Sequence, residues 1–249
     1  MITSARQIDM QEVSKQFGAI QALRDVSLHL DAGEVVGLIG DNGAGKSTLI
    51  KILSGVYPPD TGRILVNGEP IRLEGPKHAK SLGIETVHQD RGLVPAFRVS
   101  ENLFLGREKT RWAFLRRREM DLQAQAAVEG LGIEIRSFKA PISTMSGGQQ
   151  QAVAVARAVS TNPRLVILDE PTAALAVKEV GKVLDLMCRL RGLGVAVVFI
   201  SHVLPEILQV TDRIVVLRRG EKVGDLPTAE ADQELLVRLM IGTEVIGCG

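Results

Sequence analysis

The stretch that decides the fold is Glu34-Val-Val-Gly-Leu-Ile-Gly40, followed at once by Asp-Asn-Gly-Ala-Gly45-Lys46-Ser47-Thr48. Its first half is a short apolar run, typical of a strand buried within a sheet. Its second half fits the pattern G-x-x-x-x-G-K-[ST], and a helix is predicted from Lys46 to Leu53. A strand, a glycine-rich turn and a helix in this order predict a loop that cradles phosphate groups.

The residue types of this loop explain how it would bind a nucleotide. Its glycines allow the backbone to curl so that successive N–H groups point at phosphate oxygens. Lys46 is expected to reach the β- and γ-phosphates of ATP, and the Ser47 hydroxyl is expected to ligate Mg²⁺. A glycine-rich turn with an exposed lysine is the alternative, but the flanking strand and helix favour nucleotide binding. The predicted nucleotide-binding residues here are Gly40, Asp41, Asn42, Gly43, Ala44, Gly45, Lys46, Ser47 and Thr48.

The composition limits the class of protein. The chain has 249 residues, 45% of them hydrophobic and 24% charged, as in soluble globular domains. Its formal net charge of +1 creates no overall field that would attract nucleic acid or anionic lipid. No apolar run approaches the roughly 20 residues of a membrane-spanning helix, and the N-terminus lacks the apolar stretch of a secretory signal. Cys188 and Cys248 cannot form a disulfide framework, which favours a reducing, cytoplasmic setting.

Strand-like and helical runs alternate along the chain, which predicts an α/β core with a largely parallel sheet. Strands are predicted at residues 34–40, 63–68, 84–88, 165–168, 195–200 and 214–217. Residues 99–161 show helical patterns and no convincing strand, so we expect a helical subdomain inserted into one domain that spans residues 1–249. Within it, a helix is predicted to begin at Met120 or Asp121 and to end at Gly132. A last helix is expected over residues 228–241, capped by Thr228 or Asp232.

A cluster of basic residues precedes the helix at residue 121. Its members are Arg107, Lys109, Arg111, Arg116, Arg117 and Arg118, and the single tryptophan, Trp112, lies among them. The pattern favours a solvated loop, and a docking surface is the alternative interpretation.

Two adjacent acids end the apolar run Leu165-Val-Ile-Leu-Asp169-Glu170. If this strand ends beside the phosphate loop, Asp169 would face the magnesium ion through water. Glu170 would then face the γ-phosphate and act as the general base that orients the attacking water. A solvated turn before Pro171 is the alternative, which the complete phosphate loop makes less attractive.

Met145-Ser146-Gly147-Gly148-Gln149-Gln150 opens a predicted helix toward residue 161. Ser146 and Gln149 have the spacing of a capping box, which is a purely structural interpretation. A cap does not require Gly147 and Gly148, however, and these glycines would expose the first N–H groups of the helix as an anion site. Both interpretations stay open at the level of composition and spacing.

These motifs together resemble the ATPase subunits of ABC transporters over nearly the whole chain. The resemblance rests on their fixed order: the phosphate loop, Gln89 in Val87-His-Gln-Asp90, Ser146-Gly-Gly-Gln149, Asp169-Glu170-Pro-Thr172 and Ser201-His202. It implies a phosphate-loop NTPase core with an additional antiparallel β portion. It also implies a head-to-tail dimer in which the Ser146 helix of one subunit caps the γ-phosphate held by Lys46 of the other.

The resemblance implies roles for three residues that look ordinary by themselves. Gln89 resembles the glutamine that contacts magnesium and senses the membrane partner, although a loop amide is the plain interpretation. His202 resembles the histidine that touches the γ-phosphate beside Glu170, whereas a lone histidine after a strand is often structural. Phe17 resembles the aromatic residue that stacks on adenine, although phenylalanine is also a routine core residue.

Within this family the chain is most similar to importers of simple sugars. The stretches that carry this likeness are residues 51–59, 100–106, 170–175 and 239–242. The implied partners are transmembrane permease subunits, a second ATPase subunit (a homodimer is expected) and, indirectly, a sugar-binding protein, with no nucleic acid. The implied location is the cytoplasmic face of the membrane, as a peripheral subunit. One departure is Ala176, which stands where the family commonly has an aspartate that couples the two sites.

Three other functions fit parts of the sequence. An ATPase of the same superfamily that acts on nucleic acid or the ribosome would usually carry long coiled coils or tandem domains, which this sequence lacks. A phosphotransferase for a small substrate would leave residues 146–149 and His202 without a purpose. An exporter, or an importer of another subfamily, shares every catalytic residue named above, and only the sugar-type stretches argue against it.

Overall fold

The computed structural model describes residues 6–112, 114–135 and 137–242. Cys248, one of the two cysteines considered above, lies outside this range. The first sheet has four antiparallel strands in the order β2-β1-β4-β5. Its strands are β1 (Arg6–Phe17), β2 (Ile20–Asp31), β4 (Thr61–Val66) and β5 (Glu69–Ile71). This sheet forms the antiparallel part of the predicted fold.

The second sheet has six strands in the order β12-β11-β3-β10-β9-β6, and all but the edge strand β12 run parallel. Its strands are β3 (Val35–Ile39), β6 (Ile84–Val87), β9 (Leu165–Asp169), β10 (Ala196–Ile200), β11 (Arg213–Arg218) and β12 (Glu221–Pro227). Each strand predicted from an apolar run is present, and the predicted fold class is confirmed.

Alternate residues of the central strands face two different hydrophobic cores, because successive side chains of a strand point to opposite faces. Val36 and Leu38 of β3 belong to the core shared with the antiparallel sheet and α1 (Lys46–Leu53). Val35 and Ile39 belong to the core on the opposite face, which α5 (Gly147–Val159), α6 (Val177–Gly192), α7 (Leu204–Val210) and α8 (Gln233–Ile241) cover. The sheet is therefore buried on both faces, which explains its continuous apolar strands.

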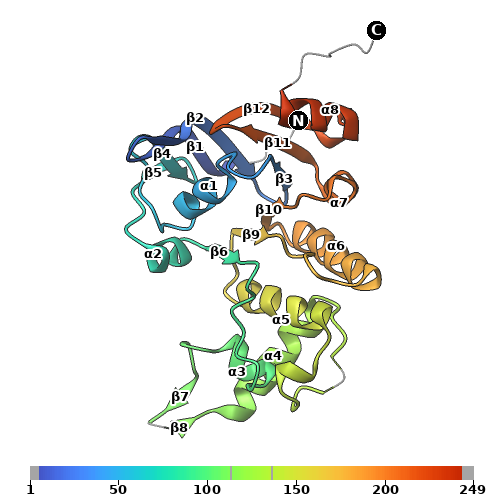
Figure 1. The fold of residues 1–249 in the computed structure, drawn as a ribbon. Helices are drawn as coiled ribbons and strands as arrows, with labels where there is room; N and C mark the ends of the chain where they lie inside the picture. Colours follow the sequence, from blue (N-terminus) through green and yellow to red (C-terminus); the bar gives the residue numbers. More distant parts are fainter. Residues whose placement is uncertain (1–5, 113, 136, 243–249) are drawn as a thin grey trace.

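The helices fall into two groups in Figure 1. Those around the sheets are α1, α2 (Pro76–Ser81), α6 (Val177–Gly192), α7 (Leu204–Val210) and α8 (Gln233–Ile241). Those at the opposite end of the molecule from α8 are α3 (Val99–Leu103), α4 (Arg117–Gly130) and α5 (Gly147–Val159). No helix among the described residues combines the length and apolar character needed to span a bilayer.

Three local predictions were wrong. α4 begins at Arg117, earlier than Met120 or Asp121, and Glu119 in its first turn pairs with Arg116 at 2.8 Å and with Lys109 at 3.3 Å. Residues 99–161 do contain strands, because β7 (Thr110–Arg111) and β8 (Phe114–Leu115) form a short hairpin.

The last predicted helix is divided into two pieces. Thr228 begins a separate 3-10 turn (Thr228–Glu230), and its hydroxyl lies 2.8 Å from that of Thr211. Asp232 alone caps α8, because its carboxylate accepts a hydrogen bond from the Leu235 N–H at 2.7 Å. The predicted cap at Asp232 is therefore confirmed, and the helix starts five residues later than expected.

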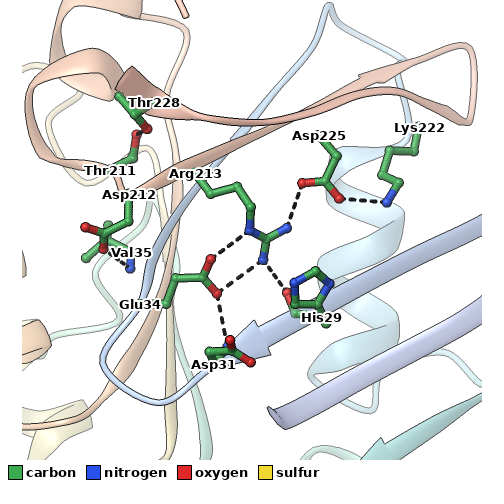
Figure 2. A network of polar contacts seen from close by, with 10 residues as sticks. All are labelled: His29, Asp31, Glu34, Val35, Thr211, Asp212, Arg213, Lys222, Asp225 and Thr228. Carbon is green, nitrogen blue, oxygen red and sulfur yellow. Dashed lines mark hydrogen bonds and ion pairs between the residues drawn. The ribbon is translucent and has the colours of Figure 1, made fainter. Parts of the chain in front are cut away.

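A network of ion pairs centred on Arg213 joins the two sheets (Figure 2). The guanidinium donates to Glu34 at 2.7 and 3.2 Å, to Asp225 at 2.8 Å and to the carbonyl of His29 at 2.6 Å. The neighbouring Asp212 accepts a hydrogen bond from the Val35 N–H. The pKa of Arg213 is raised: burial disfavours its charge, but the bonds to Glu34 and Asp225 outweigh that effect. The network fixes the start of β3, the strand that leads into the phosphate loop.

Candidate functional site

Most of the predicted site residues lie at one edge of the parallel sheet, where its strands have their carboxyl ends. β3, β10 and β9 are adjacent and parallel, with Ile200 level with both Leu38 and Asp169. Segments that follow parallel strands emerge at the same edge of a sheet. The structure therefore brings together residues 40–48, Asp169 with Glu170, and Ser201 with His202. β6 ends at the same edge, because Val87 pairs with Leu168, so Gln89 follows nearby.

The backbone of residues 40–48 requires glycine at its turning points. Gly40, Gly43 and Gly45 have φ values of 148°, 82° and 107°, which side-chain-bearing residues rarely adopt. A Cβ at Gly40 would also lie 2.2 Å from the carbonyl oxygen of Leu217, so the loop packs closely on the end of β11. The Gly220 N–H supports the loop by donating to the Ala44 carbonyl at 3.0 Å.

The loop offers donors to an anion. The N-cap of α1 is Gly45, which has no side-chain cap, so the first N–H groups of α1 have no intrahelical partner and no capping side chain. Lys46 folds back over the loop and donates to the carbonyl oxygens of Gly40 and Asp41. Burial lowers the pKa of Lys46, although Glu170, Asp41 and Asp169 act to raise it. These features fit a bound polyphosphate, which would satisfy the N–H groups and offset the burial of the ammonium.

Asp169 and Glu170 are held differently at the end of β9. Burial raises the pKa of the Asp169 carboxyl, and the charge of Glu170 adds to this effect, while His88, Lys46 and Lys51 oppose it. Glu170 has a φ of 49°, an uncommon left-handed backbone conformation for glutamate. Its N–H donates to the Ile200 carbonyl at 3.0 Å, and its Oε1 lies 3.3 Å from Nδ1 of His202. The charges of the acidic pair thus act on Lys46, and His202 lies beside Glu170.

Glu206 supports Glu170 and His202 indirectly, through contacts with their neighbours in the sequence. It was not identified from the sequence. Its Oε2 accepts a hydrogen bond from the Thr172 hydroxyl at 2.6 Å and lies 3.4 Å from the Ser201 hydroxyl. Ser201 in turn accepts a bond from the Val203 N–H at 3.0 Å. Glu206 therefore joins the residues that flank Glu170 and His202. The spacing S-H-x-x-x-E, with a threonine two residues after Glu170, is a signal that a search for such contacts could have used.

The segment after β6 connects the sheet edge to α5. Gln89 is exposed, with no hydrogen bond from its side chain among the described residues. Arg91 donates to Gln150 at 3.0 Å and to Gln151 at 3.1 Å. Arg157 donates to the carbonyl oxygens of Arg91 and Gly92. Hydrogen bonds of Arg91 and Arg157 therefore join this segment to α5.

The capping box predicted at the start of α5 is confirmed. Ser146 Oγ accepts from the Gln149 N–H at 3.3 Å, and Gln149 Oε1 accepts from the Ser146 N–H at 3.2 Å. Gly147 and Gly148 have a second purpose, because α6 packs closely against them. A Cβ at Gly148 would lie 2.8 Å from the Cβ of Glu179. A hydrogen bond from Ser146, with a further one from the Gly148 N–H, lowers the pKa of Glu179.

Two groups of predicted residues are not joined to this edge by any described hydrogen bond or ion pair. The first is Ser146 with Gly147, Gly148 and Gln149, at the start of α5. The second is Phe17, at the end of β1, whose ring is 41% exposed and packs edge-on against Tyr57 with the centroids 5.2 Å apart. Their part in nucleotide binding stays a prediction.

Ala176 has a structural consequence that the sequence did not reveal. It is the N-cap residue of α6 and provides no side-chain cap for that helix. An aspartate, which the family commonly has here, is among the preferred N-cap residues. The carboxylate in the first turn of α6 is instead Glu179, the residue that contacts the start of α5.

The fold and this edge define a phosphate-loop nucleotide-binding protein, and comparison with known proteins specifies the family. Residues 23–173 match the ABC transporter family. The ribose import ATP-binding protein RbsA of Corynebacterium glutamicum is 44% identical over 96% of this chain and 45% of its own length. The xylose/arabinose import ATP-binding protein XylG of Sulfolobus acidocaldarius is 42% identical over 94% of this chain and 93% of its own length.

Solved structures agree. The ADP conformation of MJ1267, an ATP-binding cassette of an ABC transporter, superposes with a TM-score of 0.83 at 26% identity, covering 96% of this chain and 99% of that one. A dimeric post-hydrolysis state of the cassette MJ0796, bound to ADP and Pi, gives 0.74 at 27% identity, covering 89% and 98%. The chain belongs to the ABC transporter family. It spans about half the length of the ribose-import relatives that it matches.

Proposed function

We propose that this chain is the ATP-binding and ATP-hydrolysing subunit of an import system that powers uptake of a simple sugar through a membrane permease. One observation carries the proposal: the loop with Lys46 shares a sheet edge with Asp169, Glu170 and His202. The similarity to RbsA and XylG, both sugar-import ATP-binding proteins, supports the sugar class.

The residues of the loop divide the work of binding. When bound, ATP supplies the bond that is broken, and Mg²⁺ supplies positive charge at its phosphate oxygens. The N–H groups of residues 40–48 would hold the phosphates, with Lys46 as a point charge and Phe17 against the adenine. Ser47, Asp169 and Gln89 would hold Mg²⁺. The described residues contain no cluster of three His, Cys, Asp or Glu side chains that could hold a metal ion by themselves.

Glu170 would act as the general base in hydrolysis. Its carboxylate would accept the proton of the attacking water, while His202 would hold that carboxylate in position and contact the γ-phosphate. Because the backbone of Glu170 is bonded to the end of β10, the carboxylate is held at a defined place before the nucleotide arrives. Gln89 would complete the site and connect it, through Arg91, to α5.

The start of α5 would act on a nucleotide held by a second subunit. Ser146, Gly147, Gly148 and Gln149 are not joined to the loop of their own chain, and the related MJ0796 cassette is dimeric in its post-hydrolysis state. We infer a head-to-tail homodimer with two ATP sites, in which residues 1–249 form one ABC ATPase domain and approximately residues 99–161 form its helical subdomain. The closed dimer would bind ATP more tightly than ADP, and this difference in affinity would supply the mechanical work.

The remaining partners follow from this assignment. The permease would bind at the membrane, the ATPase would lie peripherally on its cytoplasmic face, and a sugar-binding protein would act indirectly from the other side. Nucleic acid is not an expected partner, because the net charge is only +1.

The test is purification of the chain with the membrane proteins that accompany it, followed by ATPase assays in vesicles across a panel of sugars. The proposal expects stimulation by one sugar or a small group of sugars, and a turnover number lowered by about 10²–10⁴-fold in the Glu170→Gln variant. Stimulation only by a solute of another chemical class would refute sugar import and leave the ATPase assignment intact. Hydrolysis at the wild-type rate in Glu170→Gln would refute the catalytic assignment.

A further inference from the structure

The hairpin of β7 and β8 presents large apolar side chains to solvent. Trp112, at the turn, is 90% exposed, and Phe114 is 80% exposed. Leu115, the last residue of β8, is also exposed. The strands have two residues each, so this is a narrow, projecting tip, at the end of the molecule opposite to α8 (Figure 1). Exposed aromatic residues gathered at one point mark a contact surface.

Positive charge surrounds this tip. Residues 107–119 contain six basic and two acidic side chains, whereas the whole chain has a net charge of only +1. Lys109 and Arg116 pair with Glu119. Arg111, Arg117 and Arg118 are exposed, and their side chains make no hydrogen bond or ion pair with the described residues. Three free guanidinium groups thus lie on the hairpin or just after it in the sequence.

We propose that the β7–β8 hairpin is a membrane-surface contact, in which Trp112 and Phe114 enter the interfacial layer of an anionic bilayer while Arg111, Arg117 and Arg118 bind lipid phosphates. Aromatic rings favour the membrane–water interface, and arginine binds phosphate through several N–H groups. A projecting tip suits a lipid surface, which yields to it, better than a protein partner, which would need a matching cavity. The inference does not depend on ATP hydrolysis or on the sugar class.

Tryptophan fluorescence tests this proposal directly. The chain contains one tryptophan, so its tryptophan fluorescence reports on residue 112 alone. The full chain is mixed with vesicles of phosphatidylcholine and phosphatidylglycerol, and separately with pure phosphatidylcholine vesicles. We expect the emission to shift to shorter wavelength, and acrylamide quenching to decrease, with the anionic vesicles only.

Variants separate the contribution of the aromatic side chain from that of the arginines in a vesicle sedimentation assay. Trp112→Ala should weaken binding about tenfold, as expected for loss of one large apolar side chain. Its control is Ile20→Ala, which removes another exposed apolar side chain (70%) from the turn side of β2 and should leave binding unchanged. The triple change of Arg111, Arg117 and Arg118 to Gln should weaken binding about a hundredfold, since each arginine near an anionic surface contributes roughly fivefold.

A triple change of Arg63, Arg72 and Arg238 to Gln removes the same charge elsewhere and is the matched control. Equal loss of binding in both triple variants would overturn the proposal, because binding would then follow total charge. Unchanged Trp112 emission with anionic vesicles would overturn it as well. So would protection of Trp112 from acrylamide in a detergent-purified complex with a membrane protein and without lipid, since the hairpin would then contact protein.

Discussion

His202 Nδ1 lies 3.3 Å from Glu170 Oε1, and the two residues follow adjacent parallel strands. Backbone and side-chain hydrogen bonds both support this contact. The Glu170 N–H donates to the Ile200 carbonyl, and Glu206 contacts Thr172 and Ser201, which are close in sequence to the two residues. A carboxylate fixed in this way is suited to accept a proton from a water molecule at one defined place. The first prediction concerns this carboxylate.

Glu170→Gln should lower the turnover number of ATP hydrolysis by about 10²–10⁴-fold, because the amide cannot accept the proton. ATP binding should persist, since the loop of residues 40–48 is unchanged, and an ATP-bound dimer should accumulate. Steady-state ATPase assays and gel filtration with ATP measure the two effects. Glu230→Gln is the control and should behave as the wild type. A variant that is monomeric with ATP at high protein concentration would contradict the expected dimer.

Asp169→Asn should raise the melting temperature of the nucleotide-free protein at neutral pH. Burial and the charge of Glu170 raise the pKa of Asp169, so the folded protein binds this proton more tightly than the unfolded chain. The stability associated with the protonated form is therefore lost as pH rises through the raised pKa, and asparagine avoids that loss. The gain should vanish below about pH 4, where aspartate is protonated in both states.

Thermal unfolding across this pH range measures the effect, with the exposed Asp185→Asn as the control. A lower melting temperature for Asp169→Asn at neutral pH would show that the carboxylate stabilises the empty site. Magnesium-dependent ATP hydrolysis should be lost in the same variant, because Asp169 is the predicted magnesium ligand.

Arg213→Met should reduce the free energy of unfolding by about 3 kcal/mol, because Glu34 and Asp225 would lose a largely buried partner. The side chain of Arg213 is only 13% exposed. Arg24→Met is the matched control: it breaks a pair of similar length with Glu221, but Arg24 is 61% exposed. That change should cost less than about 1 kcal/mol. Urea unfolding measures both, and equal losses would show that burial of the network is unimportant.

Gly148→Ala should impair ATP-dependent dimerisation and hydrolysis, because its Cβ would lie 2.8 Å from Glu179 and displace the start of α5. Gly181→Ala is a helical control in α6 with no neighbouring atom within 4 Å of the new Cβ. It should be neutral or stabilise the fold by about 0.5–1 kcal/mol. Adding Glu179→Gly to Gly148→Ala removes the Cβ that the new side chain would strike, and it should restore part of the activity if the steric contact is the cause. If the double variant regains no activity, the steric contact with Glu179 is not the cause of the defect.

The sequence predicted those parts of the fold whose signals are local. The phosphate loop, the acids after β9 and the capping box at Ser146 each depend on residues within a few positions of one another. β1 and β2 were not located from the sequence. Their pairing has several register shifts, with positive φ at Glu12 and Asp25, which interrupts the alternation of apolar residues.

The supporting residues of the site could not be predicted in the same way. Glu206 reaches Thr172 across 34 positions, and Glu179 reaches the start of α5 from another helix. Such contacts depend on how strands and helices pack, so the spacing S-H-x-x-x-E alone does not show which residues Glu206 contacts. The early start of α4 was missed because ion pairs of Glu119 with Arg116 and Lys109 stabilise a basic first turn.

The most direct measurement is calorimetric titration of Mg-ATP into wild-type protein and the Lys46→Ala variant, with turnover measured on the same samples. The loop of residues 40–48 holds Lys46 over its own carbonyl groups, ready to exchange them for phosphate. We predict at least a roughly tenfold loss of ATP affinity and loss of hydrolysis. Wild-type affinity and turnover in Lys46→Ala would contradict the central role of this loop.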